Sequence, residues 1–361
     1  MRNNSDILAR EKEESIDVPR TVIPPEDIVA FNESRSCADL YRLYKNAQLD
    51  VKPSFQRGIV WKNKEQSLFI DSLIKQLPIP SLCISLDVRT QKRLVIDGLQ
   101  RIWSIIKFLG YEKEDWRLSD SADLDTRISG KAVSYISEHH KILFDKLENL
   151  TIPITVIRCD YSKSTHMDYL FQIFSRLNSG GNKLLNQEIR NCVFQGALNN
   201  LLLELARSEV WLKAVRTTVA AVNQARFGNE ERILRFFAMY ESRRIYKGNL
   251  SGFLNKFMDE NKSASNDKLI KWKTLFLRTL SIINRMAIPD EIRKNKNLFE
   301  GVLIGVGVNI NSIEGLSNLE LNQKLRCLEK TRPYSDDVRE GMAHTIKVQE
   351  RLSAAISAFG A

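Results

Sequence analysis

The residues best able to do chemistry lie in the run "VIDGLQRIW", where an apolar stretch gives way to an amphipathic one. Asp97, Gln100 and Arg101 place a carboxylate, a carboxamide and a guanidinium within five residues, and Gly98 permits a turn there. The start of a helix attracts anions, and an Arg adds a bidentate donor. A carboxylate beside a phosphate repels it unless it holds Mg²⁺ or a water. The pattern predicts a phosphate and metal site, although Asp before Gly is also a common helix cap.

Two further segments carry polar side chains of the same kinds. In "PSFQRGIVW", Gln56 and Arg57 stand between two aromatic residues that could anchor the segment. In "FSRLNSGGNKLLNQEIRN", Gly-Gly permits the close backbone approach that a phosphate cradle needs. Taken alone, the first of these segments is equally typical of a surface loop. The second is equally typical of a plain connection between helices. The candidate residues of the second segment are Arg176, Asn178, Gly181, Glu188 and Arg190.

The elements that must position these residues change in kind along the chain. Strand-like runs such as "SLCISLDV", "RLVID" and "LTIPITVIRCD" alternate with helical patterns, among them a helix over 63–77 capped by Asn63. Toward the C-terminus helical spacing dominates, as in "KLIKWKTLFLRTLSIINRM". We predict an α+β protein with a mobile segment (1–22), a mixed α/β domain (23–196) and an all-helical domain (197–361) packed against it.

Composition narrows the class of protein. The formal charge of +10 and the pI near 9.3 permit attraction to nucleic acid without requiring it. The five Cys are scattered without a C-x-x-C pair, which argues against a zinc cage or disulfide framework and fits a reducing interior. The N-terminus shows no secretory pattern, and "GVLIGVGVNI" is too short to cross a bilayer. We expect a cytoplasmic protein without a membrane partner.

Taken in order, the three segments resemble the ParB/sulfiredoxin-like domain at the N-terminus of GmrSD-type, modification-dependent restriction enzymes. The resemblance spans roughly Ile23 to the C-terminus. In place of the first Gln of the family's usual Asp-Gly-Gln-Gln-Arg, this chain has Leu99, which falls on the apolar stripe of the predicted helix. The matching residues are Phe55-Gln56-Arg57 with Trp61, Asp97-Gly98 with Gln100-Arg101, and Phe174-x-Arg176-x-Asn178 with Gly181, Leu184, Glu188 and Arg190.

This resemblance implies a domain that binds a nucleoside triphosphate and hydrolyses it with Mg²⁺ or Mn²⁺, coupled to DNA restriction against phages. It implies that Asp97 orients the metal or water, and that Gln100 and Arg101 contact phosphate. Gln56 and Arg57 would close the site or touch DNA. The implied nucleotide-binding set is Gly98, Arg176, Asn178, Gly181, Glu188 and Arg190.

Many relatives carry a fused HNH-type nuclease, which clusters His and Asn or Asp around a metal. The four His of this chain form no such arrangement: His139 and His140 are adjacent, while His166 and His344 stand apart. We therefore expect that the HNH module is absent and that the protein acts either with a separate nuclease subunit or as a stand-alone effector. DNA is an expected partner in both cases. The sequence does not determine the oligomeric state, and an oligomer is compatible with it.

Two other functions compete with nucleotide hydrolysis. The first is a metal-dependent DNA endonuclease that uses the same site, with Asp97 and Glu188 as a thin pair of metal ligands. The second is a non-catalytic DNA-binding subunit that uses the basic segments "YESRRIYKG", "KLIKWK" and "EIRKNKN". Such segments are equally typical of the solvated faces of helices.

Overall fold

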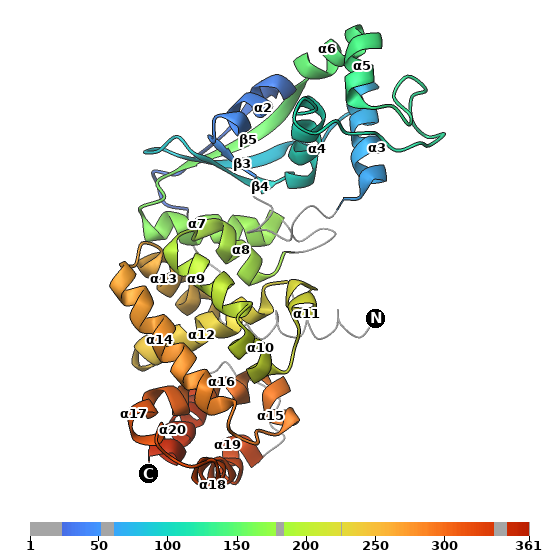
Figure 1. Cartoon of the computed structure of the whole chain (residues 1–361). Helices are drawn as coiled ribbons and strands as arrows, with labels where there is room; N and C mark the ends of the chain where they lie inside the picture. The colour runs from blue at the N-terminus through green and yellow to red at the C-terminus, as the bar shows by residue number, and fades with distance from the viewer. Residues whose placement is uncertain (1–23, 52–60, 178–183, 225, 336–344, 361) are drawn as a thin grey trace. The chain divides into compact units, whose positions relative to one another are not determined.

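The computed structural model describes residues 24–51, 61–177, 184–224, 226–335 and 345–360 (Figure 1). The chain divides into two compact units, which we call the α/β unit (Val22–Leu184) and the helical unit (Leu185–Ala361). The helical unit thus begins at Leu185, whereas the sequence pattern placed the boundary near 196. The predicted mobile segment, 1–22, lies outside the described residues.

The α/β unit is built on a five-stranded mixed sheet with the order β1-β5-β3-β4-β2 (Figure 1). β3 runs parallel to β5 and antiparallel to β4, so β4 ends beside the start of β3. This register sets Asp97, the last residue of β4, opposite Cys83. The two edge strands also differ in direction relative to their neighbours: β1 is antiparallel to β5, and β2 is parallel to β4. The strands are β1 (Val29–Ser36), β2 (Leu49–Asp50), β3 (Leu82–Asp87), β4 (Arg93–Asp97) and β5 (Thr151–Cys159).

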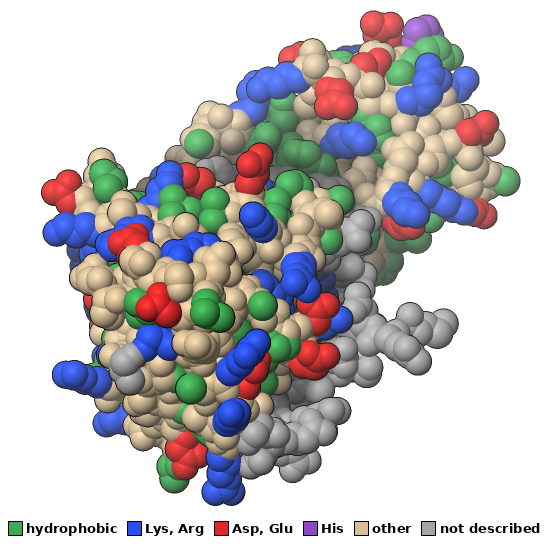
Figure 2. Space-filling view, turned by 60° about the horizontal axis from the view of Figure 1, so that its bottom comes forward, with side chains coloured by type: hydrophobic (Ala, Val, Ile, Leu, Met, Phe, Trp, Pro, Cys, Tyr) green, Lys and Arg blue, Asp and Glu red, His purple; other side chains and the backbone are tan. Residues whose placement is uncertain are grey.

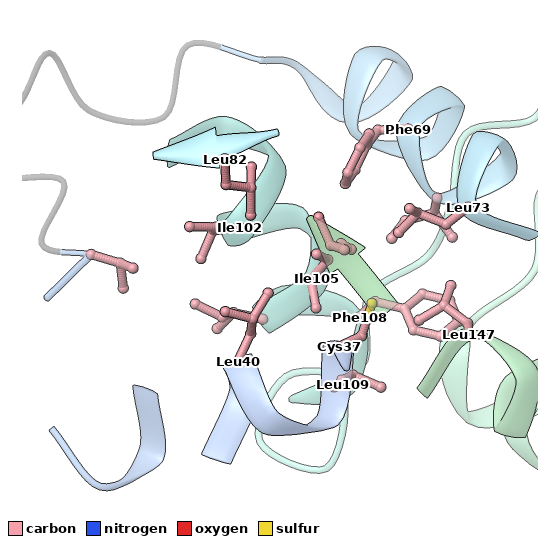
Figure 3. Close-up of a cluster of buried hydrophobic side chains, with 14 of the residues drawn as sticks. Cys37, Leu40, Phe69, Leu73, Leu82, Ile102, Ile105, Phe108, Leu109 and Leu147 are labelled. Carbon is pink, nitrogen blue, oxygen red and sulfur yellow. The ribbon is translucent and has the colours of Figure 1, made fainter. Parts of the chain in front are cut away.

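One face of the sheet carries the main hydrophobic core of this unit. Leu40, Phe69 and Ile105 come from three different helices and gather there beside Leu82 of β3 (Figure 3). Each such side chain contributes about 1.5–3 kcal/mol when it leaves water. The covering helices are α2 (Cys37–Lys45), α3 (Asn63–Ile74), α4 (Leu99–Leu109), α5 (Val133–His139) and α6 (Lys141–Asn149).

The opposite face of the sheet is also buried. Ser85 pairs in register with Leu94 and Ile157, and all three are shielded from solvent. α7 (Ser164–Leu177) contacts β4 and lies across the sheet from α4 (Figure 1). The unit is therefore a helix–sheet–helix sandwich, and the mixed α/β class predicted from the sequence is confirmed.

The helical unit contains no strand among its described residues. Its core is rich in aromatic side chains, including Trp211, Phe276 and Phe299. The helices are α8 (Asn186–Val193), α9 (Ala197–Ala206), α10 (Glu209–Val215), α11 (Val219–Gln224), α12 (Gly228–Ser242), α13 (Leu250–Asn261), α14 (Asn266–Ile283), α15 (Asp290–Lys294), α16 (Lys296–Val308), α17 (Ile310–Ile313), α18 (Asn318–Glu329), α19 (Arg332–Ser335) and α20 (Thr345–Gly360), with a short 3₁₀ helix, η1 (Arg243–Ile245).

The apolar run "GVLIGVGVNI" belongs mostly to α16, which is buried against α20. In the part of the chain that the structure describes, no helix is both long and apolar enough to span a bilayer.

Candidate functional site

The candidate site forms where β4 turns into α4. Gly98 is the residue between them, and its backbone is left-handed, with φ of +94°. A Cβ at this position would lie 2.3 Å from Leu82 Cδ2 and 3.2 Å from Arg101 Nη2. Both the backbone conformation and the close approach of its neighbours therefore require glycine. Because Gly98 has no side chain, it does not cap the first turn of α4 as an Asp or Ser would.

Asp97 and Arg101 face one another across this turn. Arg101 Nη2 donates to Asp97 Oδ2 at 2.7 Å, and Arg101 Nη1 donates to the carbonyl of Pro80. The Asp97 side chain is 41% exposed, and that of Arg101 is 15% exposed. A solvent-accessible carboxylate is thus oriented by a guanidinium that the protein itself holds in place.

Gln100 connects this turn to the first of the sequence segments. Its Oε1 accepts the backbone N–H of Trp61 at 3.1 Å. The Trp61 ring packs against Phe69 of α3, with ring centroids 5.8 Å apart. Trp61 therefore packs into the α/β unit, while Phe55, the other predicted anchor, lies outside the described residues. Gln56 and Arg57 lie outside the described residues.

Leu99 is a core residue in this protein. Its side chain is only 9% exposed and joins the cluster that α4 buries against the sheet. The position that departs from the family's usual motif therefore serves packing here.

The third segment is divided between the two units, with Arg176 in the α/β unit and with Glu188 and Arg190 in the helical unit. Arg176 lies exposed near the end of α7, and Asn178 and Gly181 lie outside the described residues. Glu188 belongs to α8 of the helical unit and is fully buried. Its carboxylate accepts the N–H of Leu185 at 2.7 Å and takes two bonds from the Arg226 guanidinium, at 2.6 and 3.0 Å. Glu188 thus fixes the start of α8.

Arg190 is likewise buried within the helical unit. Its Nε donates to Asn255 Oδ1 at 2.9 Å, and its Nη1 donates to Gln187 Oε1 at 3.2 Å. The Glu231 carboxylate lies 3.8 Å away. These partners give Arg190 and Glu188 a structural explanation, so neither enters the site proposed below.

No cluster of three or more His, Cys, Asp or Glu suited to a metal ion occurs among the residues described here. Mg²⁺ does not need such a cluster, because it commonly binds one or two carboxylates together with substrate phosphates and waters. The half-exposed carboxylate of Asp97 fits that pattern of binding. The neighbouring Cys83 does not supply a thiolate, because burial and the charge of Asp97 raise its pKa to about 12.

Sequence reasoning missed two partners of the site and the role of one histidine. The Pro80 carbonyl, which receives Arg101, and the Leu82 side chain, which abuts Gly98, come from the segment before and at the start of β3. No pattern in the sequence pairs that segment with β4. His166 also differs from a surface histidine: it is buried, Nδ1 accepts the N–H of Asp160 at 3.0 Å, and Nε2 lies 2.8 Å from Asp27 Oδ1. Both nitrogens are thus engaged in holding the chain together.

These features define a class: a mixed α/β domain with an Asp–Arg pair at a glycine turn, followed by a helical unit. Residues 38–195 match the family described as the GmrSD restriction endonuclease, N-terminal domain. The match begins in α2, ends just after α8, and so extends beyond the α/β unit into the helical unit. None of the curated proteins or solved structures compared with this chain matches it.

Proposed function

We propose that this protein binds and hydrolyses a nucleoside triphosphate with Mg²⁺ or Mn²⁺, as the nucleotide-dependent component of a DNA-restriction system that includes a separate nuclease. The observation that carries the proposal is the Asp97–Arg101 pair, held at 2.7 Å where α4 begins. A helix start favours phosphate, and a guanidinium beside it adds directed donors.

In this proposal each group of the site has a distinct task. Asp97 holds the metal together with the phosphates of the substrate, and the metal neutralises charge that develops on those phosphates. Arg101 keeps the Asp97 carboxylate oriented and brings positive charge to the phosphates. Gln100, which follows Asp97 by less than one helical turn, places its carboxamide at the same end of α4.

Involvement in restriction rests on the family that residues 38–195 match, whose name is that of a restriction endonuclease. The charge distribution is compatible with DNA as a partner. The helical unit has 27 Lys and Arg against 19 Asp and Glu, whereas the α/β unit has 23 against 20. The net positive charge of the chain thus comes mainly from the helical unit.

The purely DNA-binding alternative receives less support from the basic segments. Arg293 is buried and donates to the carbonyls of Ile288 and Ala214, and Lys273 pairs with Glu204. On the face shown in Figure 2, Lys and Arg side chains are interspersed with Asp and Glu over the helical unit. Such mixed charge is typical of a solvated surface.

The test is Mg²⁺-dependent phosphate release by the full chain. We expect Asp97→Asn and Arg101→Lys each to lower kcat by about 100-fold or more, because the first removes the carboxylate that holds the metal and the second loses the directed guanidinium donors that orient Asp97 and face the phosphates. Asp145→Asn and Arg158→Lys change a half-exposed and an exposed residue of the same unit, away from the β4–α4 turn, and serve as matched controls. Thermal melting of all four variants checks that the fold survives. Unchanged turnover in both site variants would remove the assigned site.

The same preparation separates the alternatives. Nicking of plasmid DNA without added nucleotide, abolished in Asp97→Asn, would replace the proposal with the endonuclease. DNA binding with a steep salt dependence, in a protein that neither nicks DNA nor releases phosphate, would identify a regulatory subunit.

A further inference from the structure

The buried carboxamide of Gln66 is hydrogen-bonded at both its nitrogen and its oxygen. Gln66 of α3 is only 4% exposed. Its Nε2 donates to the carbonyl of Trp61 at 3.0 Å, and its Oε1 accepts from Lys107 Nζ at 3.3 Å. Both halves of the amide are therefore engaged, as a buried carboxamide requires.

The backbone of Trp61 is hydrogen-bonded to side chains of two helices. Gln66 of α3 bonds its carbonyl, and Gln100 of α4 accepts its N–H at 3.1 Å. Its ring packs against Phe69, which belongs to α3. The backbone of Trp61 is thus the piece of chain through which α3 and the first turn of α4 are joined.

Lys107 adds a second connection between α3 and α4. It lies on α4 about two turns beyond Gln100, and its bond to Gln66 returns from α3 to the same helix. Its Nζ also stands 4.5 Å from the centroid of the Trp116 ring, whose Nε1 donates to Asn63 at the start of α3. Burial lowers the pKa of Lys107. Four hydrogen bonds and one cation–π contact therefore fix α3 and α4 relative to one another.

We propose that Gln66 is a positioning residue for the candidate site: by holding the Trp61 carbonyl, it fixes the Trp61 N–H against Gln100 and so sets the orientation of the Gln100 carboxamide. The assignment of a reaction to this arrangement rests on the proposed function, whereas the arrangement itself does not.

Three substitutions separate the two contacts of Gln66. Gln66→Glu keeps an acceptor for Lys107 but sets a carboxylate oxygen against the Trp61 carbonyl. Lys107→Met removes the other contact and leaves the Trp61 bond intact. Gln66→Met removes both contacts at nearly constant volume. Gln323→Met, on an exposed position of α18, is the matched control.

The first measurement is hydrogen exchange of the Trp61 backbone N–H in the full chain, labelled with ¹⁵N-Trp, of which the chain has five. We expect exchange to accelerate about fivefold or more in Gln66→Glu and Gln66→Met, since one hydrogen bond is worth about that factor. Lys107→Met should change it less, and Gln323→Met should leave it unchanged. If Gln66→Glu behaves as wild type while Lys107→Met reproduces Gln66→Met, the proposal is wrong.

The second measurement is nucleotide hydrolysis by the same variants. We expect Gln66→Glu to lower kcat by about 10- to 100-fold with KM little changed, because the loss is one of orientation. Adding Gln100→Ala should then bring little further loss. Equal kcat in Gln66→Glu and wild type, with accelerated Trp61 exchange, would overturn the positioning role. If wild type releases no phosphate, the proposed function fails, while the exchange data still decide whether Gln66 fixes Trp61.

Discussion

Substitution of Gly98 by alanine tests the geometry of the β4–α4 turn directly. A left-handed backbone costs a non-glycine residue about 1–2 kcal/mol. The new Cβ would also stand 2.3 Å from Leu82 Cδ2 in the core, and overpacking of this kind costs about 1–3 kcal/mol. We therefore expect Gly98→Ala to lower the free energy of unfolding of the α/β unit by about 2–5 kcal/mol. For a unit of this size the corresponding fall in Tm is about 10 °C.

Because the chain has two compact units, the assay must report on each unit separately. Hydrogen exchange followed by mass spectrometry does so, since peptides from β3, β4 and α4 belong to one unit and peptides from α16 to the other. Exchange should accelerate in the first set alone. Gly98→Ala should also impair phosphate release, because its Cβ crowds the Arg101 guanidinium.

Two comparisons make this reasoning refutable. In a Leu82→Ala background the steric part of the cost is relieved, so Gly98→Ala should then cost only about 1–2 kcal/mol. Gly315→Ala, where a Cβ meets no atom within 4 Å, should change stability by less than about 0.5 kcal/mol. A Gly98→Ala protein as stable as wild type would show that the turn is not held as described.

Two predictions concern the helical unit. Arg226→Ala removes the partner of the buried Glu188 carboxylate and should destabilise this unit by about 3–5 kcal/mol, whereas Arg226→Lys should cost less; equal stability of the alanine variant in urea unfolding would contradict the structural role. Burial raises the pKa of Glu230, so the folded state favours its neutral form. The stability that this gives is present below the ordinary pKa of Glu and lost as pH rises through the raised value. Glu230→Gln should therefore match wild type in acid and exceed it at neutral pH in melting experiments.

The residue pattern predicted the secondary structure correctly where interactions between residues close in the sequence determine it. The run "RLVID" forms a strand with the bounds Arg93–Asp97, and the helix predicted after Gly98 begins at Leu99. Strand-forming residues followed by a glycine that permits a left-handed turn leave few alternatives. The helical half was predicted for the same reason, since apolar spacing of 3.6 residues recurs along it.

Local pattern was wrong at the start of α3. Asn63 was expected to cap this helix, but Lys62 occupies the cap position and Asn63 is the first helical residue. The Asn63 side chain instead accepts from Trp116 Nε1 and donates to the carbonyl of Arg117. A partner more than fifty residues away therefore outcompeted the local cap, because a buried indole N–H needs an acceptor.

The sequence by itself determined the mixed and helical halves, the turn at Gly98, and the presence of Asp97 and Arg101 within one turn of each other. Tertiary structure alone decided that Arg101 folds back between Asp97 and the Pro80 carbonyl, and that Gln100 meets Trp61. It also decided that Glu188 and Arg190 are buried in the interior of the helical unit. The physical reason is that spacing sets which residues share an element, whereas hydrogen-bond partners are chosen by burial and by contacts across the sheet, which no local pattern encodes.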